Sequence, residues 1–562
     1  MAGGVKKPVN IFKLKQLGIP RQSLNWRLWL AVLNFGLLGT ARGIDEGLIT
    51  AAFNSPSFQK LIHFDQYSAV ERANIKGNVT AMVLLGSIPG SLIAAYVCDR
   101  LGRLWAMREL CIVWILGIVI FMTSNGNMGA IYAGRFIAGI GVGQSVVVGP
   151  IYVAEIAPAP IRGLCTCFYA GFAYSALVVA YFANYGAALH QHGKPVQWYI
   201  PTSLHFIFAT LVLALSLFQT ESPRYLMKRG KRDRAIMAMS RIRNLPATDL
   251  YVVEEIADIE QRWHEEQETT RGQGLFGLIK EIFLIPSNLF RLYLGVGGQL
   301  LAQWSGAGSI TIYAVDFFAL VGITGRNESL LATAVFGVVK FVAAMSCMLF
   351  LVDFIGRKRS LLIGIALQAI SMLYVASYLT SEPRLGVYDD YELPPAKVGA
   401  SEGAIAMIYL SGFGWALGWN SMQYVLTAEL FPLRIRAVCT SIVMCIHFAN
   451  QYGNARAVPN MLLPRSDGGI APTGTFWTFA AITVGGGLWV LFSLPETAGR
   501  SLESMDRLFQ LPWYKIGLFG NQDADNRDNE ETVNEKNVHS ATHIEISHQE
   551  PDKAEPHGSH QV

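Results

Sequence analysis

Apolar residues are gathered along this chain into long segments separated by shorter polar stretches. A helix of about 20 apolar residues is long enough to cross the hydrocarbon core of a bilayer. The pattern predicts twelve such helices, near residues 28–50, 79–98, 107–124, 129–151, 165–186, 199–219, 291–318, 330–352, 359–379, 403–427, 437–457 and 473–494. Because the number is even, both ends of the chain should lie on the same side of the membrane.

Composition and charge agree with a chain that crosses a membrane many times. Hydrophobic residues make up 52% of the sequence and charged residues 15%, whereas a soluble domain carries about 25% charge. A net charge of +4 is too small to indicate nucleic-acid binding. Lys and Arg crowd the junctions after the even-numbered spans, as in GRKR (356–359), and cytoplasmic loops carry this excess. We expect cytoplasmic termini, a plasma-membrane location, and an outside glycosylation sequon at Asn327.

The predicted spans divide the chain into five segments. A basic cytoplasmic segment (1–27) precedes an N-terminal six-helix half (28–219). Residues 220–290 are charged, with apolar residues at helical spacing, and predict a cytoplasmic linker of short amphipathic helices. A second six-helix half (291–494) is followed by a cytoplasmic tail (495–562), which we expect to be disordered from about residue 516 because apolar residues are few.

Motifs of the first half return in the same order in the second half. GSLIAAYVCDRLGR (90–103) is echoed by FLVDFIGRKR (350–359), and GPIYVAEIAPAPIRG (149–163) by YVLTAELFPLRIRA (424–437). TESPRYL, from residue 220, is echoed by PETAGRSL, from residue 495. These echoes indicate a duplicated six-helix unit. Two such halves, packed with a midplane site between them, form a transporter that exposes the site to each side in turn.

The repeated motifs place opposite charges at helix ends on the cytoplasmic face. Such pairs can latch the two halves together and must break when the site opens inward. Topology alone explains the basic residues, but acidic residues contribute little to orientation. The candidate latch residues are Asp99, Arg100, Arg103, Glu155, Arg162, Glu221, Arg224, Asp353, Arg357, Glu429, Arg436, Glu496 and Arg500.

Taken together, the motifs resemble those of the sugar porters of the major facilitator superfamily. The segments that carry the resemblance are DRLGR, GRFIAGIGVG, AEIAPAPIRG, ESPRYL and PETAGRSLE, within about residues 28–510. The resemblance implies an all-α membrane protein with twelve transmembrane helices and a cytoplasmic helical linker. Fungal members are typically proton symporters for monosaccharides or related polyols and acids, so it also implies a sugar-like substrate, protons and no cofactor.

The first span contains GTARGIDEGLIT (39–50), with three ionisable residues among apolar ones. By the resemblance, Asp45 matches the proton-binding aspartate of the family, and Arg135 matches the arginine that pairs with it. Burial favours the protonated form of a carboxylic acid, whereas a nearby arginine favours the ionised form. Moving the arginine between states would therefore toggle proton binding. The alternative is a static ion pair that only fixes helix packing.

The hexose-binding pattern of the family is altered in this chain. The seventh span keeps one amide, Gln303, of the three that typical members have, and Tyr424 stands where a tryptophan is usual. Neutral sugars are held by amides that both donate and accept hydrogen bonds, so these losses disfavour glucose. Other polar candidates for substrate binding are Tyr313, His447 and Asn450.

Cationic side chains appear at membrane depth instead. Lys340 lies about nine residues from either end of its span, which is some 14 Å deep at about 1.5 Å per residue. An ionisable residue at such depth is by default a functional hypothesis. A lysine at this position also resembles the fungal quinate- and galacturonate-type branch of the family. Lys340 either holds a substrate carboxylate or pairs with Asp316. Arg42 either binds a carboxylate or neutralises Glu46.

The sequence therefore predicts a proton symporter for a monosaccharide-like substrate, most of all a sugar acid such as galacturonate or a cyclic acid such as quinate. A neutral pentose or hexose transporter is the first alternative, and a nutrient receptor that does not transport is the second. No nucleophile–base arrangement or metal-ligand spacing indicates an enzyme. The oligomeric state is left open.

Overall fold

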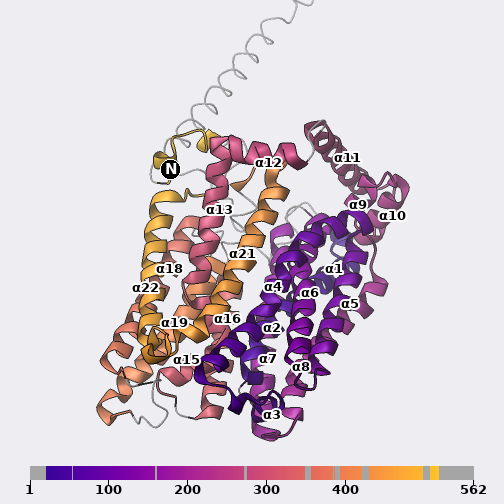
Figure 1. The fold of residues 1–562 in the computed structure, drawn as a ribbon. Coiled ribbons are helices and arrows are strands. Elements are labelled where there is room, and N and C mark those ends of the chain that lie inside the picture. Colours follow the sequence, from indigo (N-terminus) through magenta and orange to yellow (C-terminus); the bar gives the residue numbers. More distant parts are fainter. Residues whose placement is uncertain are drawn as a thin grey trace, which may run out of the picture.

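The computed structural model is built of helices (Figure 1). It describes residues 20–53, 55–158, 161–270, 275–323, 325–347, 356–383, 385, 393–420, 430–497, 505 and 507–517. The predicted disorder of the tail from about residue 516 concerns residues that lie almost entirely outside this described part.

The first half consists of helices that follow one another in chain order up to the linker. They are α1 (Trp26–Gly36), α2 (Gly39–Phe53), α3 (Pro56–Leu61), α4 (Ala69–Leu101), α5 (Arg103–Met122), α6 (Met128–Ile156), α7 (Arg162–His190) and α8 (Val196–Leu215). The segment predicted as a helical linker contains α9 (Pro223–Lys228), α10 (Arg232–Arg243), α11 (Leu250–Thr270) and α12 (Leu275–Leu284).

The second half has a similar series of helices, but its first span is divided into three consecutive helices. Its helices are α13 (Pro286–Trp304), α14 (Ala307–Ile312), α15 (Ala314–Leu320), α16 (Arg326–Ser346), α18 (Arg357–Ser381), α19 (Val398–Leu417), α21 (Leu433–Met461) and α22 (Ala471–Ser493), with the short α24 (Trp513–Ile516) after them.

Each of the twelve predicted spans coincides with a helix or with consecutive helices in the described residues. Within the described part of the chain, eight helical stretches are long and apolar enough to cross a membrane by themselves, and they lie in α4, α5, α6, α7, α8, α16, α18 and α22. The other spans correspond to α1 with α2, to α13 with α14 and α15, to α19 and to α21. The sequence-based prediction of a twelve-helix fold is confirmed.

The second span begins ten residues earlier than its apolar pattern predicts. Helix α4 begins at Ala69, because Ser68 caps it. The Ser68 hydroxyl accepts the backbone N–H of Glu71, and the Glu71 carboxylate accepts the Ser68 N–H at 2.9 Å. This capping box satisfies backbone groups at the helix start. Hydrophobicity marks the part of a helix that lies in lipid, whereas caps mark where the helix begins.

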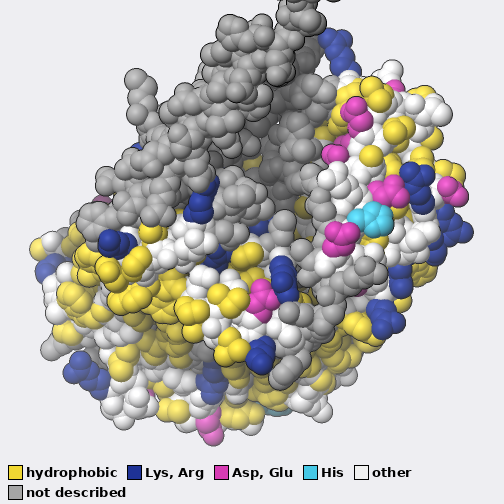
Figure 2. Space-filling view, turned by 90° about the horizontal axis from the view of Figure 1, so that it is seen from above, with side chains coloured by type: hydrophobic (Ala, Val, Ile, Leu, Met, Phe, Trp, Pro, Cys, Tyr) yellow, Lys and Arg dark blue, Asp and Glu magenta, His cyan; other side chains and the backbone are white. Residues whose placement is uncertain are grey.

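The two halves stand side by side, and the linker helices lie at one end of the bundle (Figure 1). The opposite end, near α3 and α15, is called the distal end below. Figure 2 looks onto the linker end, where Lys and Arg side chains are spread over the surface and mix with Asp and Glu on one side. Contacts between the halves run mainly between α4 and α21 and between α7 and α16.

Candidate functional site

Three glycines on one face of α2 explain how the charged stretch GTARGIDEGLIT is accommodated. Gly39, Gly43 and Gly47 are spaced four residues apart, and they face α7. A Cβ atom on Gly43 would overlap the backbone carbonyl of Ala173. Small residues let two membrane helices approach until their backbones touch. This close packing occupies one face of α2 and turns its ionisable side chains toward α6 and the second half.

Replacing Gly43 by leucine should destabilise the protein. The new side chain would meet backbone atoms of α7, which cannot move aside as a side chain can, and overpacking costs about 1–3 kcal/mol or more. We expect a lower melting temperature in detergent, measured by thermal unfolding. The matched control is Gly186→Leu, because a Cβ atom at Gly186 meets nothing within 4 Å. Equal melting temperatures for the two variants would contradict the close contact.

Asp45 and Arg135 form an ion pair in the interior of the first half. Arg135 Nη1 donates to Asp45 Oδ1, and Nη2 donates to Oδ2 at 3.3 Å. The side chains are 10% and 3% exposed. Arg135 Nε also donates to the carbonyl of Val79 at 3.2 Å. The predicted pairing is therefore present in this structure, and its role in proton coupling stays a prediction.

A second ion pair of α2 contacts the other half. Arg42 Nε donates to Glu46 Oε1 at 2.8 Å, and the side chains are 14% and 19% exposed. Gln451 of α21 donates from Nε2 to the same oxygen at 3.3 Å. Of the two alternatives for Arg42, this structure contains the pairing with Glu46. The Gln451 contact places the pair at the boundary between the two halves.

Amide and imidazole groups of α13 and α21 face each other across the second half. His447 Nδ1 lies 2.8 Å from Gln299 Oε1 and 3.2 Å from Gln303 Nε2. Trp304 Nε1 donates to Asn450 Oδ1 at 3.3 Å. Among the described residues, His447 Nε2 and Gln451 Oε1 are buried without a hydrogen-bond partner. These two atoms are among sixteen of this kind in the described residues. Because His447 and Gln451 are four residues apart on α21, one bound polar molecule would pair with both.

Lys340 is buried at the centre of α16, with 2% of its surface exposed. Its ammonium donates to Thr311 Oγ1 at 2.5 Å and lies 5.5 Å from the ring centroid of Tyr174 in the first half. The predicted alternative, a pair with Asp316, is wrong: Asp316 pairs with Lys76 of α4 at 2.6 Å. Within the described part of the chain, no carboxylate lies within ion-pair distance of Lys340.

The remaining substrate candidates divide into two cases. Tyr313 is buried, and its hydroxyl donates to the carbonyl of Ala455 at 2.6 Å. That bond joins α21 to the break between α14 and α15. In this structure the Tyr313 hydroxyl therefore makes a contact between helices. Tyr424 lies outside the described residues.

Charged motif residues of the first half cluster at the linker end. Arg103 donates to Glu155 Oε1 at 2.7 Å and to Asp99 Oδ1 at 3.3 Å. Glu221 accepts the backbone N–H of Arg103 at 3.0 Å. Burial raises the pKa of Glu221 above its usual value, although backbone N–H groups, among them that of Leu104, act in the opposite direction.

The second half has a matching contact, and the described contacts of both clusters stay within one half. Glu496 accepts the backbone N–H groups of Arg357 at 2.8 Å and of Lys358 at 3.1 Å. A latch between the halves stays a prediction. Arg100 and Arg224 are exposed, Arg436 donates to the carbonyl of Phe431, and the side chain of Arg162 together with Asp353, Glu429 and Arg500 lies outside the described residues.

Several residues of the site were not predicted as binding residues. Gln299, Gln451 and Asn454 line up with Gln303 and His447 at helical spacings of three or four residues. That spacing on one face of a helix was the available signal. Thr311 and Lys76 carried no local signal. Among the described residues, no group of three or more His, Cys, Asp or Glu could hold a metal ion.

Comparison with known proteins gives consistent matches over most of the chain. The sequence model of a family described as sugar (and other) transporter matches residues 32–509. A probable quinate permease of Aspergillus niger is 32% identical over 498 residues, which cover 87% of this chain and 89% of the relative. A quinate permease of Emericella nidulans is 31% identical over 496 residues, covering 87% and 90%.

Solved structures agree on the fold. The proton:xylose symporter XylE bound to 6-bromo-6-deoxy-D-glucose superposes with a TM-score of 0.68 at 22% identity, covering 86% of this chain and 99% of that one. The E. coli xylose transporter XylE in a partially occluded inward-open conformation also gives a TM-score of 0.68, at 20% identity and with 85% and 100% coverage.

Proposed function

Because the chain belongs to the family of sugar and other transporters, we propose that it is a proton symporter for a carboxylated, hydroxyl-rich small molecule. Family membership makes it a secondary transporter of the sugar type and not an enzyme. The proposed substrate is a sugar acid such as galacturonate or a cyclic acid such as quinate. The names of the two fungal relatives, quinate permease and probable quinate permease, support the acid class.

The observation that carries this proposal is the buried ammonium of Lys340. A buried charge is costly unless it is paired. In the described residues the Lys340 ammonium contacts the Thr311 hydroxyl and two aromatic rings. The Glu46 carboxylate attracts it from beyond ion-pair distance and is itself paired with Arg42. Arg42 and Glu46 balance each other, as do Asp45 and Arg135. The ionisable groups of the site therefore leave one positive charge, which a substrate carboxylate would neutralise.

The hydroxyl-rich part of the substrate would meet the amides and imidazole of the second half. If His447 carries its proton on Nδ1 and donates it to Gln299, its unpartnered Nε2 is an acceptor for a substrate hydroxyl. The unpartnered Oε1 of Gln451 is a second acceptor. Gln303 and Asn450 lie on the same two helices. A site with a cation and several acceptors fits a polyol acid.

Proton coupling is assigned to Asp45, with Arg135 as its switch. The pair is buried in the first half, while the proposed carboxylate-binding lysine is on the second half. A shift of α2 against α6 within the first half that withdraws Arg135 would favour protonation of Asp45, and its return would favour release. A monoanionic substrate carried with one proton would move no net charge.

Location and orientation complete the proposal. We place the protein in the plasma membrane with cytoplasmic termini, so that the linker end faces the cytoplasm and the distal end faces outside. Asn327, exposed in the first turn of α16 at the distal end, stays the proposed glycosylation site. The charged clusters at the linker end are proposed to act as the cytoplasmic latch.

Uptake measurements test the proposal. A yeast strain without its own carriers would express the chain and receive labelled galacturonate, quinate, glucose and xylose in turn. We expect uptake of an acid that exceeds uptake of either neutral sugar and that a protonophore abolishes. Uptake of glucose or xylose alone would support the neutral-sugar alternative. No uptake together with altered gene expression would support a receptor.

A further inference from the structure

One ion pair joins the two halves at the distal end. Lys76 Nζ of α4 lies 2.6 Å from Asp316 Oδ2 of α15, and the side chains are 18% and 26% exposed. The ammonium also lies 5.7 Å from the ring centroid of Tyr313. These residues are 240 positions apart in the chain. The pair is therefore a tertiary contact between halves, and it is more enclosed than an ordinary surface ion pair.

Asp316 lies on a short helix that is separated from its neighbours by a break. Helix α14 ends at Ile312, α15 begins at Ala314, and Tyr313 between them departs from helical geometry with φ −107° and ψ 30°. A helix of seven residues with such a break can move without displacing α13. Its position is then set by side-chain contacts at each end.

Residue Thr311 connects this broken span to Lys340. The Thr311 hydroxyl accepts from Lys340, and its carbonyl accepts from the Tyr181 hydroxyl of the first half at 2.6 Å. The contact at Thr311 and the ion pair at Asp316 thus flank the break at Tyr313. Opening the distal end has to undo both contacts, since each joins α7 or α4 to the second half.

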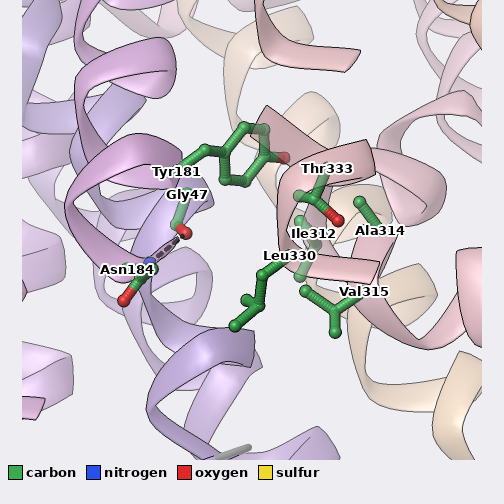
Figure 3. A pocket seen from close by; sticks show the side chains of 8 residues that line it. All are labelled: Gly47, Tyr181, Asn184, Ile312, Ala314, Val315, Leu330 and Thr333. Carbon is green, nitrogen blue, oxygen red and sulfur yellow. Dashed lines mark hydrogen bonds between the residues drawn. The ribbon is translucent and has the colours of Figure 1, made fainter. Parts of the chain in front are cut away.

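The two halves leave only a small cavity between them near this ion pair in the described residues. Figure 3 shows Gly47, Tyr181 and Asn184 of the first half facing Leu330 and Thr333 of the second half. The cavity that these residues line has a volume of about 10 Å³. That volume holds about one water molecule. Farther along the same seam, Arg456 of α21 donates to Asn74 Oδ1 of α4 at 2.8 Å. A substrate could not pass this end while these contacts persist.

We propose that Lys76 and Asp316 are positioning residues of the transport cycle. Their ion pair holds α15 on α4 and keeps the distal end closed, and it breaks each time that end opens. The pair is partly enclosed, and removal of either charge should weaken the contact between α15 and α4. The pair thereby biases the equilibrium between the two orientations of the carrier, independently of which substrate is carried.

Thiol labelling measures this bias without any substrate. Leu330 is buried at the cavity between the halves, so Leu330→Cys places a thiol where only opening of the distal end exposes it. The probe is a bulky maleimide added to purified protein in detergent, with the chain lacking the Leu330→Cys change as background. In the protein that carries Leu330→Cys, we expect Lys76→Gln and Asp316→Asn each to increase the rate of maleimide labelling at position 330 by about threefold or more.

Charge exchange supplies the decisive arm of the experiment. The double variant Lys76→Asp with Asp316→Lys restores an ion pair and should return the labelling rate to that of the parent. Lys60→Gln removes a charge from an exposed position of α3 at the same end and should leave the rate unchanged. Unchanged labelling in both single variants, or equally fast labelling in the exchanged and single variants, would overturn the proposal. Failure of the proposed substrate would leave these results unaffected.

Discussion

Replacing Asp45 by asparagine is expected to abolish accumulation of substrate while leaving exchange across the membrane intact. One proton carried per monoanion supports a concentration ratio of about tenfold for each unit of pH difference, since one pKa unit corresponds to about 1.36 kcal/mol. Asparagine cannot take up a proton, so the variant should bring the ratio to about one. Counterflow, in which labelled substrate exchanges with unlabelled substrate, needs no proton and should persist.

The same change should also lower stability, and the two effects can be separated. Asparagine leaves Arg135, which is 2% exposed, without its carboxylate, and breaking a buried ion pair costs about 3–5 kcal/mol. The double variant Asp45→Asn with Arg135→Gln removes both charges and should recover much of the melting temperature without recovering accumulation. Full accumulation by a stable Asp45→Asn protein would show that the proton is carried elsewhere.

Replacing Lys340 by glutamine is expected to raise the KM for an acidic substrate by about 30-fold or more. Removing one member of a buried charge pair costs about 2–5 kcal/mol in binding, and about 1.4 kcal/mol corresponds to tenfold. Labelled uptake of galacturonate or quinate over a range of concentrations measures the effect. Lys515→Gln, which removes a charge from the exposed end of α24, is the matched control.

Stability should change in the opposite direction to activity at this position. In this structure the Lys340 ammonium is buried, and no carboxylate of the described residues lies within ion-pair distance of it. Its removal should keep or raise the melting temperature, because functional residues are often retained at a cost to stability. A Lys340→Gln protein that loses both stability and uptake would indicate a structural role. Undiminished uptake of the acid would remove Lys340 from the site.

Much of the fold followed from the length of the apolar segments, and the exceptions have local causes. Hydrophobicity located α5, α6, α18 and α22 to within a few residues, but it missed the polar first turns of α4, which depend on the cap at Ser68. It also read the first and seventh spans as single helices. The break at Tyr313 has no signature in hydrophobicity, because the residues on either side of it are apolar.

The site was predictable where one residue matched a motif and unpredictable where two distant residues had to meet. The pairing of Asp45 with Arg135 came from the family resemblance, and Lys340 stood out by its depth in the membrane. The sequence offered Asp316 only as an alternative partner of Lys340, whereas packing of α15 on α4 brings Asp316 to Lys76. Such a contact depends on how the halves dock, which one sequence read linearly does not contain.

The central claim, that a proton moves together with a carboxylated polyol, is tested most directly by recording pH outside proteoliposomes that contain the purified protein. Galacturonate or quinate would be added to a weakly buffered suspension, with glucose and xylose as comparisons and empty liposomes as background. We expect external alkalinisation on addition of an acid that the protein exchanges in counterflow, and none with either neutral sugar. Exchange of an acid without any alkalinisation, or alkalinisation by glucose or xylose, would contradict the claim.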